Sequence, residues 1–114
     1  ETPFSTIFNS NKIGFEKNEK SGNMNVIPKA DGAWIQVKNV EFSNGFTRFM
    51  FIGKGKGKIQ LHFDSLDSEM SEVFVLESND WGKYEWPLMK TVTGIRNLYF
   101  VFEGPLKADS WQFL

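Results

Sequence analysis

The residues capable of acid–base chemistry are few. His62 is the only histidine, and carboxylates follow it at Asp64, Asp67, Glu69 and Glu72. A glycosidase requires two carboxyl groups that flank a cleft, and a triad hydrolase requires a nucleophile beside its histidine. No G-x-S-x-G sequence or equivalent accompanies His62. Since acidic residues in loops are usually solvated, we expect a chain that is not itself an enzyme.

The run GKGKGK at 53–58 has the composition of a phosphate cradle. It lacks the spacing and the Ser or Thr of a P-loop, and no helical pattern follows it. Arg48, Phe49 and Phe51 lie nearby, so stacking plus charge on single-stranded nucleic acid is the next interpretation. The balance of 13 basic and 14 acidic residues, with net charge −1, argues against nucleic acid. We therefore expect a hairpin turn with solubilising lysines and no nucleic-acid partner.

Two tryptophans are placed unlike ordinary core residues. Trp34 shares its side of an alternating pattern with Gln36 and Lys38, and Trp81 lies inside SNDWG (78–82), a turn sequence. A tryptophan ring at the surface covers the flat C–H face of a sugar, while neighbouring amides and charges bond to its hydroxyls. The alternative is that both rings are partly buried packing residues.

Length and composition predict one compact domain covering 1–114. The chain has 114 residues, of which 40% are hydrophobic and 16% aromatic, enough for a core at this size. It has no cysteine, so disulfides, thiolate metal sites and cysteine nucleophiles are excluded. Its apolar runs are far shorter than a membrane span, so no membrane partner is expected. Because it begins at Glu1, we interpret it as a processed or excised fragment.

Strands must position these side chains. Alternating or densely apolar stretches occur at 33–42, 46–53, 58–64, 72–77 and 97–104. Turn signals separate them at 21–23, 30–32, 43–45, 53–57, 78–82, 93–94 and 104–105. Residues 65–72 form one helical turn at most. The pattern predicts an all-β, antiparallel, jelly-roll-like β-sandwich of two packed sheets, with Trp86 and Trp111 in its core.

Four segments in a fixed order carry a resemblance to a known family. They are GNMNVIPKADGAWIQVKNVEF (22–42), KGKIQLHFDSLDSEM (56–70), TGIRNLYFVFEG (93–104) and DSWQF (109–113). The chain resembles the family 6 carbohydrate-binding modules, β-sandwiches appended to hydrolases of plant and algal polysaccharides. It is most similar to modules that follow family 43 glycoside hydrolases, enzymes acting on arabinose- and xylose-containing polymers.

The resemblance gives Trp81 a role. SNDWG falls where the family has a Gly-Gly-Trp loop, whose tryptophan is one wall of a sugar cleft at the end of the sandwich. The opposite aromatic wall corresponds to Pro28, and the asparagine that bonds to sugar hydroxyls corresponds to Ala108. Two of three signature residues are therefore absent from this end cleft. Polar replacements could come from Asn79, Lys107 or Asp109.

The family has a second sugar site, on the concave face of one sheet, where the aromatic of a Gly-Asp-aromatic triplet stacks. Trp34 holds that position and has the outward phase. Alternation adds four polar neighbours: Gln36, Arg48, Gln60 and His62. We expect this face to be functional in preference to the depleted end cleft.

The family's structural calcium is not expected here. Its ligands include glutamates near the chain start and the Asp before the closing Trp, and that Asp is replaced by Ser110. Calcium requires six or more oxygen ligands, several of them carboxylates. We expect no cofactor.

Two functional hypotheses follow. The first is a non-catalytic, monomeric carbohydrate-binding module of a secreted, periplasmic or cell-surface bacterial glycoside hydrolase, binding plant or algal polysaccharide, with xylan or arabinoxylan favoured. The second is a degenerate module that packs on the neighbouring catalytic domain and binds little sugar itself. The second predicts an apolar patch larger than a sugar needs, to which Trp81 could belong.

Overall fold

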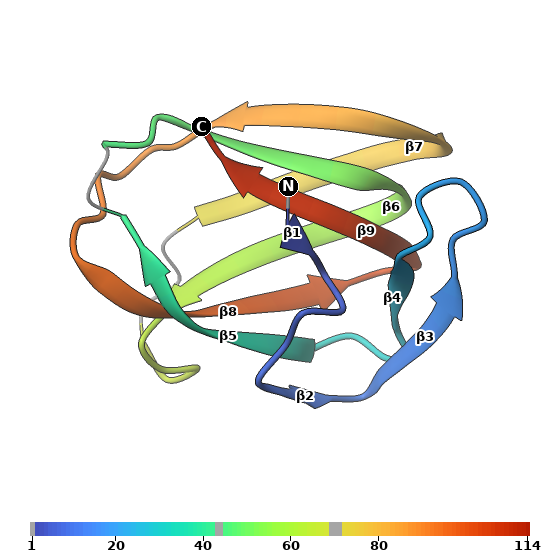
Figure 1. Ribbon diagram of the computed structural model, residues 1–114, viewed down its shortest axis with the longest axis horizontal. Coiled ribbons are helices and arrows are strands. Elements are labelled where there is room, and N and C mark those ends of the chain that lie inside the picture. Colours follow the sequence, from blue (N-terminus) through green and yellow to red (C-terminus); the bar gives the residue numbers. More distant parts are fainter. Residues whose placement is uncertain (1, 43–44, 69–71) are drawn as a thin grey trace.

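The computed structural model describes residues 2–42, 45–68 and 72–114, and all regular structure in them is β-strand (Figure 1). The strands are β1 (Thr2–Pro3), β2 (Asn9–Asn11), β3 (Ile13–Lys17), β4 (Met24–Pro28), β5 (Ala33–Glu41), β6 (Arg48–Phe63), β7 (Glu72–Pro87), β8 (Ile95–Glu103) and β9 (Leu106–Phe113). Every strand pair is antiparallel. The predicted all-β, antiparallel sandwich is confirmed.

The strands form two layers that share the long pair β6 and β7. The pairing order is β2-β5-β8-β6-β9-β4-β3, with β7 along β6 and β1 along β9. Residues 58–63 of β6 pair with β8, and residues 49–55 pair with β9. The first layer is therefore β2, β5, β8 and the distal half of β6 with the start of β7. The second layer contains the proximal half of β6, the end of β7, and β9, β4, β3 and β1.

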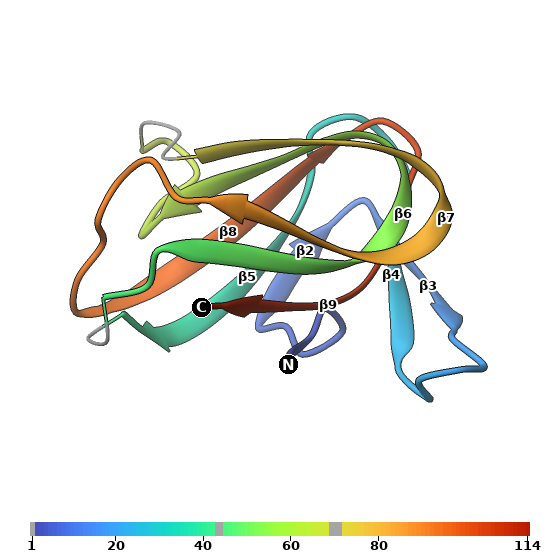
Figure 2. The same ribbon diagram turned by 90° about the horizontal axis from the view of Figure 1, so that it is seen from above.

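A bend in β6 carries the strand from one layer to the other (Figure 2). The turn predicted at 53–57 is therefore wrong, because β6 stays paired through these residues, with β7 on one side and β9 on the other. The glycines serve a close crossing instead: a Cβ at Gly57 would collide with the Glu103 carbonyl oxygen, and one at Gly55 with the Pro105 carbonyl oxygen. Glycine is required where two backbones approach this closely.

The turn predicted at 78–82 is also wrong. β7 continues through it, but its register jumps from Gly82 opposite Gly53 to Ser78 opposite Gly55. Three residues, 79–81, thus face the single residue Lys54. This insertion is a β-bulge, which bends the strand and redirects a side chain. The sequence Asn-Asp-Trp-Gly at 79–82 forms a bulge and not a turn, because β6 pairs with β7 on both sides of it.

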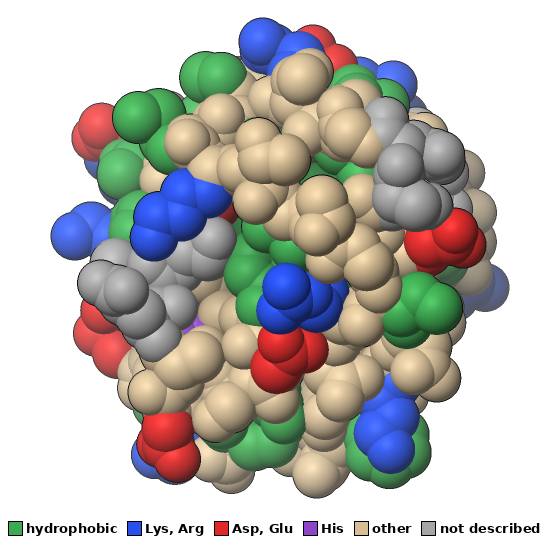
Figure 3. Space-filling view, turned by 90° about the vertical axis from the view of Figure 1, so that its left-hand side faces the viewer, with side chains coloured by type: hydrophobic (Ala, Val, Ile, Leu, Met, Phe, Trp, Pro, Cys, Tyr) green, Lys and Arg blue, Asp and Glu red, His purple; other side chains and the backbone are tan. Residues whose placement is uncertain are grey.

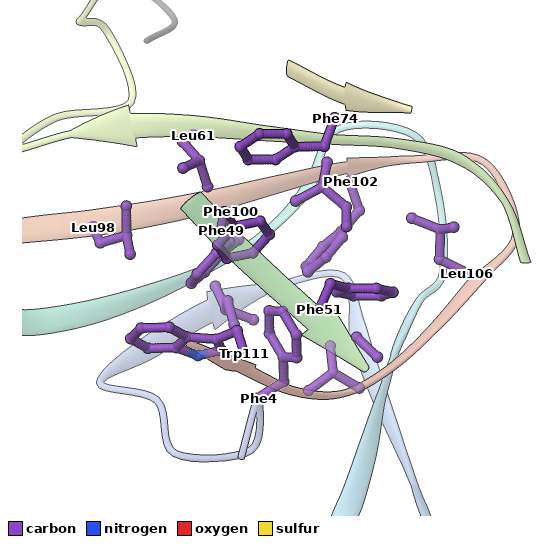
Figure 4. Packing of buried hydrophobic residues seen from close by; sticks show 14 of the residues in the cluster. Phe4, Phe49, Phe51, Leu61, Phe74, Leu98, Phe100, Phe102, Leu106 and Trp111 are labelled. Atoms are coloured by element: carbon purple, nitrogen blue, oxygen red, sulfur yellow. The ribbon is translucent and has the colours of Figure 1, made fainter. Parts of the chain in front are cut away.

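An aromatic core fills the space between the layers (Figure 4). Phe49 of the second layer stacks on Phe74 of the first at 4.8 Å between ring centroids, and it lies 5.9 Å from Phe100. Trp111 is buried at 5.3 Å from Phe100, and Trp86 is a partly buried neighbour of the core, as predicted. These stacked and tilted contacts join the two sheets.

The remaining turn predictions hold where the structure describes them. Gly22, Gly32, Gly94 and Gly104 have positive φ angles of 78° to 85°. Gly45 also has positive φ, whereas 43–44 lie outside the described residues. Residues 65–68 form a turn closed by Ser68 N–H and the Ser65 carbonyl, and the expected helical turn extends into 69–71, which are not described.

Candidate functional site

The first layer presents an aromatic and amide surface away from the core. Trp34 pairs with Val101, and Gln60 pairs with Val101 from the other side. In the next row, Tyr99 lies between Gln36 and His62, but Gln36 is buried and not exposed as predicted. Directly paired residues share a face of a sheet, so alternation places all of these side chains together. We call this surface the Trp34 face: Trp34, Gln36, Gln60, His62, Tyr99, Val101, Val73 and Val75.

Trp34 is held by a ring contact and is half-buried. Its ring centroid lies 5.6 Å from that of Tyr99, at 67°, an edge-to-face geometry. Gln60 donates to Glu103 at 3.2 Å, and the His62 Nδ1 lies 3.0 Å from the Ser68 carbonyl oxygen. The polar groups are thus oriented by neighbours before any ligand arrives. Such preorganisation lowers the entropic cost of binding.

Two valines extend the Trp34 face across β7. Val73 pairs with Gln60 and Val75 with Lys58, so both point outward, and Val75 is 60% exposed. β7 pairs only with β6 among the described residues, so this is the layer's edge. The face therefore runs from β5 to an open edge and could accommodate an extended chain.

Arg48 does not belong to the Trp34 face. It begins β6 in the second layer, opposite Pro87, and its Nε lies 3.9 Å from a Glu85 carboxylate oxygen. The sequence prediction grouped Arg48 with His62 by alternation, from two separate strands joined by a turn at 53–57, but both residues lie on the single strand β6. The bend in β6 separates them into different layers.

Trp81 projects from the β7 bulge, where hydrogen bonds fix the backbone. The Tyr84 hydroxyl lies 2.7 Å from Ser78 Oγ and 3.0 Å from the Asp80 carbonyl oxygen. Asp80 N–H donates to Ser78 Oγ at 3.3 Å. Trp81 is 39% exposed, so it is a partly exposed surface ring in a defined position.

One cleft of about 640 Å³ adjoins this ring. Its lining residues are Asn18, Glu19, Lys20, Ser21, Ile52, Trp81, Gly82, Lys83 and Asp109, and we call it the Trp81 cleft. Asp109 is only 4% exposed, and its Oδ1 accepts from Ser21 Oγ and Asn23 Nδ2, each at 3.1 Å. Asp109 Oδ2 is not among the described buried side-chain atoms that lack a hydrogen-bond partner. The cleft thus combines an aromatic wall with a carboxylate, at a volume typical of small-ligand sites.

The wall facing Trp81 is the connection between β3 and β4. Asn18 Oδ1 accepts from the N–H groups of Lys20 and Ser21, at 3.0 and 3.2 Å. At the base of this hairpin, Glu16 lies 2.8 Å from Lys107 Nζ. Hydrogen bonds from Lys107 and Asn25 hold the pKa of the Glu16 carboxyl below its usual value. The hairpin is therefore fastened to β9, the strand that carries Asp109.

A second, smaller cleft of about 340 Å³ contains the positions where the resemblance expects the end cleft. Pro28, Asn79 and Lys107 line it, but Trp81 does not. Lys54 also lines it, and the Lys54 Nζ lies 5.5 Å from the centroid of the Trp81 ring. Ala108 is fully buried and offers nothing to this Pro28 cleft. The Lys54 ammonium is therefore within cation–π distance of the Trp81 ring on this side.

The acidic cluster of the sequence is dispersed in structural roles. Asp64 binds Arg96 at 2.6 Å, and the carboxylate of Glu72 accepts the N–H groups of Met89 and Lys90 at 2.9–3.1 Å. Asp67 is exposed, and Glu69 lies outside the described residues. No pair of these described carboxylates flanks a cleft.

Connections between strands gather at the opposite end of the sandwich (Figure 1), where hydrophobic side chains lie beside charged ones (Figure 3). A hollow at this end is lined by Phe42, Phe46, Phe63 and Glu72 among others. Its volume is about 10 Å³, which holds one water at most. A sugar cannot enter it.

Residues 2–42, 45–68 and 72–114 contain no group of three His, Asp or Glu side chains arranged to hold a metal. At the position of the expected calcium ligand, Ser110 is buried and its Oγ has no hydrogen-bond partner among the described residues. A lone hydroxyl does not fit calcium, which takes several carboxylate oxygens. The described chain also has no helix that is long and apolar enough to span a bilayer.

Comparison with known proteins identifies the chain's relatives. The model of the family "Carbohydrate binding module (family 6)" matches residues 6–114. The chain belongs to carbohydrate-binding module family 6. This family consists of non-catalytic binding modules, so the module binds carbohydrate and is not itself an enzyme.

Three relatives illustrate the match. An arabinoxylan arabinofuranohydrolase from Bacillus subtilis (strain 168) is 29% identical, over 80% of this chain and 20% of its own length. The structure of a family 43 arabinoxylan arabinofuranohydrolase from B. subtilis, in complex with cellotetraose, superposes with TM-score 0.87 and 26% identity, over 98% of this chain and 26% of that one. A family 6 module from Clostridium cellulolyticum, in complex with xylose, gives TM-score 0.90 at 18% identity, over 99% and 95% of the two chains.

Sequence reasoning missed part of both surfaces. Tyr99, Val73 and Val75 follow the same alternation as Gln60 but were hidden inside apolar runs. The sequence of residues 18–21, which line the Trp81 cleft, indicated only a turn. No local pattern indicates that it faces Trp81, because that proximity depends on β4 pairing with β9.

Proposed function

We propose that this family 6 module binds a stretch of xylan or arabinoxylan on the Trp34 face and keeps an attached family 43 glycoside hydrolase near its substrate. The observation that carries this is the half-buried ring of Trp34 on the outer sheet face that also presents Gln60 and His62. Sugars offer flat C–H surfaces to rings and hydroxyls to amides. The names of the B. subtilis relatives support arabinoxylan as the polymer. A bacterial, extracellular origin fits the same relatives.

The expected affinity is modest. Covering about 70 Å² of apolar ring contributes roughly 2 kcal/mol. Two hydrogen bonds at about 1 kcal/mol each bring the total near 4 kcal/mol, which corresponds to a dissociation constant of about 1 mM. An open face binds weakly, which suits a module that must release and rebind along a polymer.

An NMR titration with xylohexaose and arabinoxylo-oligosaccharides, following the four indole N–H signals, tests the proposal. The Trp34 signal should shift and saturate at millimolar sugar. Trp34→Ala should abolish measurable binding, whereas Met89→Ala, an exposed change in the β7–β8 connection, should not alter it. Binding that survives Trp34→Ala unchanged would contradict the assignment to this face.

A second candidate function is docking on the catalytic domain. The exposed Val73 and Val75 at the edge of β7 favour it, because an unpaired edge with apolar side chains suits a protein partner. The same NMR titration with sugar decides between sugar binding and docking. No shift of Trp34 with any tested sugar at about 10 mM would favour docking.

We further propose that the module needs no calcium at the position of Ser110. Removing metal with EDTA, or adding millimolar Ca²⁺, should leave the melting midpoint unchanged. If the module had a specific calcium site, Ca²⁺ at 100 times the dissociation constant of that site would add about 2.7 kcal/mol of stability. That would raise the midpoint by roughly 10 °C in a domain of this size, which would contradict the proposal.

A further inference from the structure

The edge strand β2 borders the Trp34 face on the side opposite to β7. We propose that Asn11, on this strand, is a specificity-determining residue: its amide bonds to two adjacent free hydroxyls of the sugar stacked on Trp34, and so selects an unbranched residue of the polysaccharide backbone at that position. This inference rests on the proposed function, because it requires a sugar on Trp34. It adds the residue that decides which part of an arabinoxylan is bound.

Strand pairing places Asn11 beside the tryptophan ring. Asn11 pairs directly with Trp34. Its neighbour Ser10 pairs with the fully buried Ile35, so Ser10 points toward the core and Asn11 points outward. Directly opposed residues of antiparallel strands have Cβ atoms about 4.5–5.5 Å apart. A sugar that covers the Trp34 ring is therefore within hydrogen-bonding reach of the Asn11 amide.

The backbone on both sides of Asn11 is fixed. Before it, the Phe8 N–H donates to the Gln36 carbonyl oxygen at 2.8 Å, which extends the pairing of β2 with β5. After it, Lys12 has a φ of 57°, and its carbonyl oxygen accepts the Lys29 N–H at 2.9 Å. This left-handed residue turns the chain from β2 into β3. The Asn11 side chain is thus presented from a defined position, which lowers the entropic cost of binding.

Asn9 and Asn11 lie on the same side of β2 but differ in what their amides can bond. Asn9 pairs with Gln36, one row away from Trp34. The Asn9 Oδ1 accepts the Ser10 N–H at 2.9 Å, so it is already engaged by the backbone of its own strand. Asn11 is exposed, and its amide makes no hydrogen bond with another described residue. Both the oxygen and the nitrogen of the Asn11 amide are therefore available to a ligand.

The chemistry of the amide defines the sugar that suits it. One amide presents an acceptor and a donor side by side, so one sugar hydroxyl can donate to it while the adjacent hydroxyl accepts from it. A branch on the donating hydroxyl replaces its hydrogen and leaves the amide oxygen without that bond. A site that hydrogen-bonds a hydroxyl discriminates against an analogue that lacks it. Asn11 therefore favours a bare backbone residue over one that carries arabinose.

The rest of the Trp34 face does not provide the same selection. Its opposite border presents the methyl groups of Val73 and Val75, which do not bond to hydroxyls. Between the borders, the Gln60 amide already donates to Glu103 at 3.2 Å. The preference for an unbranched residue is thus expected where Asn11 adjoins the Trp34 ring.

The experiment is a set of NMR titrations of the full 114-residue chain with two probes. One is xylohexaose, and the other is a xylohexaose that carries arabinose on every backbone residue, so that no bare residue is available to Trp34. The signals followed are the Trp34 indole N–H and the Asn11 side-chain amide. The proteins are the wild type, Asn11→Ala and Asn9→Ala. Asn9→Ala is the matched control, because it removes the same side chain from the same face of the same strand, and thermal melting checks both folds.

We expect xylohexaose to shift both signals, Asn11→Ala to weaken that binding about fivefold, and Asn9→Ala to change it by less than about twofold. The branched probe should bind the wild type more weakly than xylohexaose does. Asn11→Ala should not weaken binding of the branched probe further, because the bond to the free hydroxyl is already lost.

A saturating Trp34 shift with unchanged affinity in Asn11→Ala would overturn this inference and leave the proposed function standing. The inference also fails if Asn9→Ala causes the same loss, or if the branched probe binds the wild type as tightly as xylohexaose. Absence of a Trp34 shift with both probes would overturn both proposals. If Asn11→Ala is unfolded, Asn11→Ser takes its place and must give the loss expected of Asn11→Ala.

Discussion

Replacing Phe49 with alanine should lower the free energy of unfolding by about 4 kcal/mol, within the usual range for a buried phenylalanine. Phe49 is fully buried, and its ring centroid lies 4.8 Å from that of Phe74 and 5.3 Å from that of Phe113. It also contacts Phe100 and Trp86. Because these partners come from three strands and both layers, no single neighbour can move to fill the cavity. Urea denaturation followed by tryptophan fluorescence measures the loss.

The control for this change is Phe8→Ala. Phe8 is 60% exposed and lies beneath the Lys38 ammonium, 3.8 Å from its ring centroid. An exposed ring with one cation contact should contribute about 1 kcal/mol or less. Equal losses in the two variants would mean that the core between the layers is not organised as described. A typical domain has about 5–15 kcal/mol of stability in total, so the core change should remove between roughly a quarter and most of it.

The alternation of apolar and polar residues was sufficient to predict the first layer. It assigned Trp34, Gln36, Gln60 and His62 to an outward phase, and strand pairing then brings these residues together. Period-two patterns work here because each of these strands buries only one face. Alternation carries no information about which strand pairs with which, so the closeness of Trp34 and Gln60, across Val101, required the structure.

The bend in β6 is where sequence reasoning failed. Glycines at 53, 55 and 57 match a turn as well as a crossing, since both need residues without a Cβ. Only the presence of the Glu103–Leu106 backbone across from them selects the crossing. Contacts between segments distant in sequence are also the reason why Arg48 was assigned to the wrong surface and why the Trp81 cleft was not predicted. Its parts come from the β3–β4 hairpin, the β7 bulge and β9, which are distant in sequence.

The bend also lies between the residues that β6 contributes to the Trp34 face and to the Trp81 cleft. Residues 58–63 of β6 supply Gln60 and His62 to the Trp34 face, and Ile52, before the bend, lines the Trp81 cleft. Lys54, within the bend, lies over the Trp81 ring. A change in the path of β6 therefore alters both surfaces, although they lie on different parts of the molecule.

Gly57→Ala should consequently cost about 3 kcal/mol or more of stability, at the upper end of the range for overpacking. The added Cβ would overlap the Glu103 carbonyl oxygen and approach Gly104 Cα to 3.1 Å. These are backbone atoms of the tight β8–β9 connection, and Gly104 already has a φ of 83°, so neither strand can yield cheaply. In the folded fraction, signals of Gln60 should move as well, because Gln60 donates to the displaced Glu103.

Gly94→Ala separates steric overlap from backbone strain. Gly94 has the same φ of 83°, but a Cβ there would meet nothing within 4 Å. Its replacement should cost only the left-handed conformation, about 1 kcal/mol, and should leave the signals of Gln60 and Trp34 in place. Urea denaturation and amide NMR spectra compare the two variants directly. If Gly57→Ala is no more destabilising than Gly94→Ala, then β6 does not cross the β8–β9 connection at close range, and the spatial link between the Trp34 face and the Trp81 cleft fails with it.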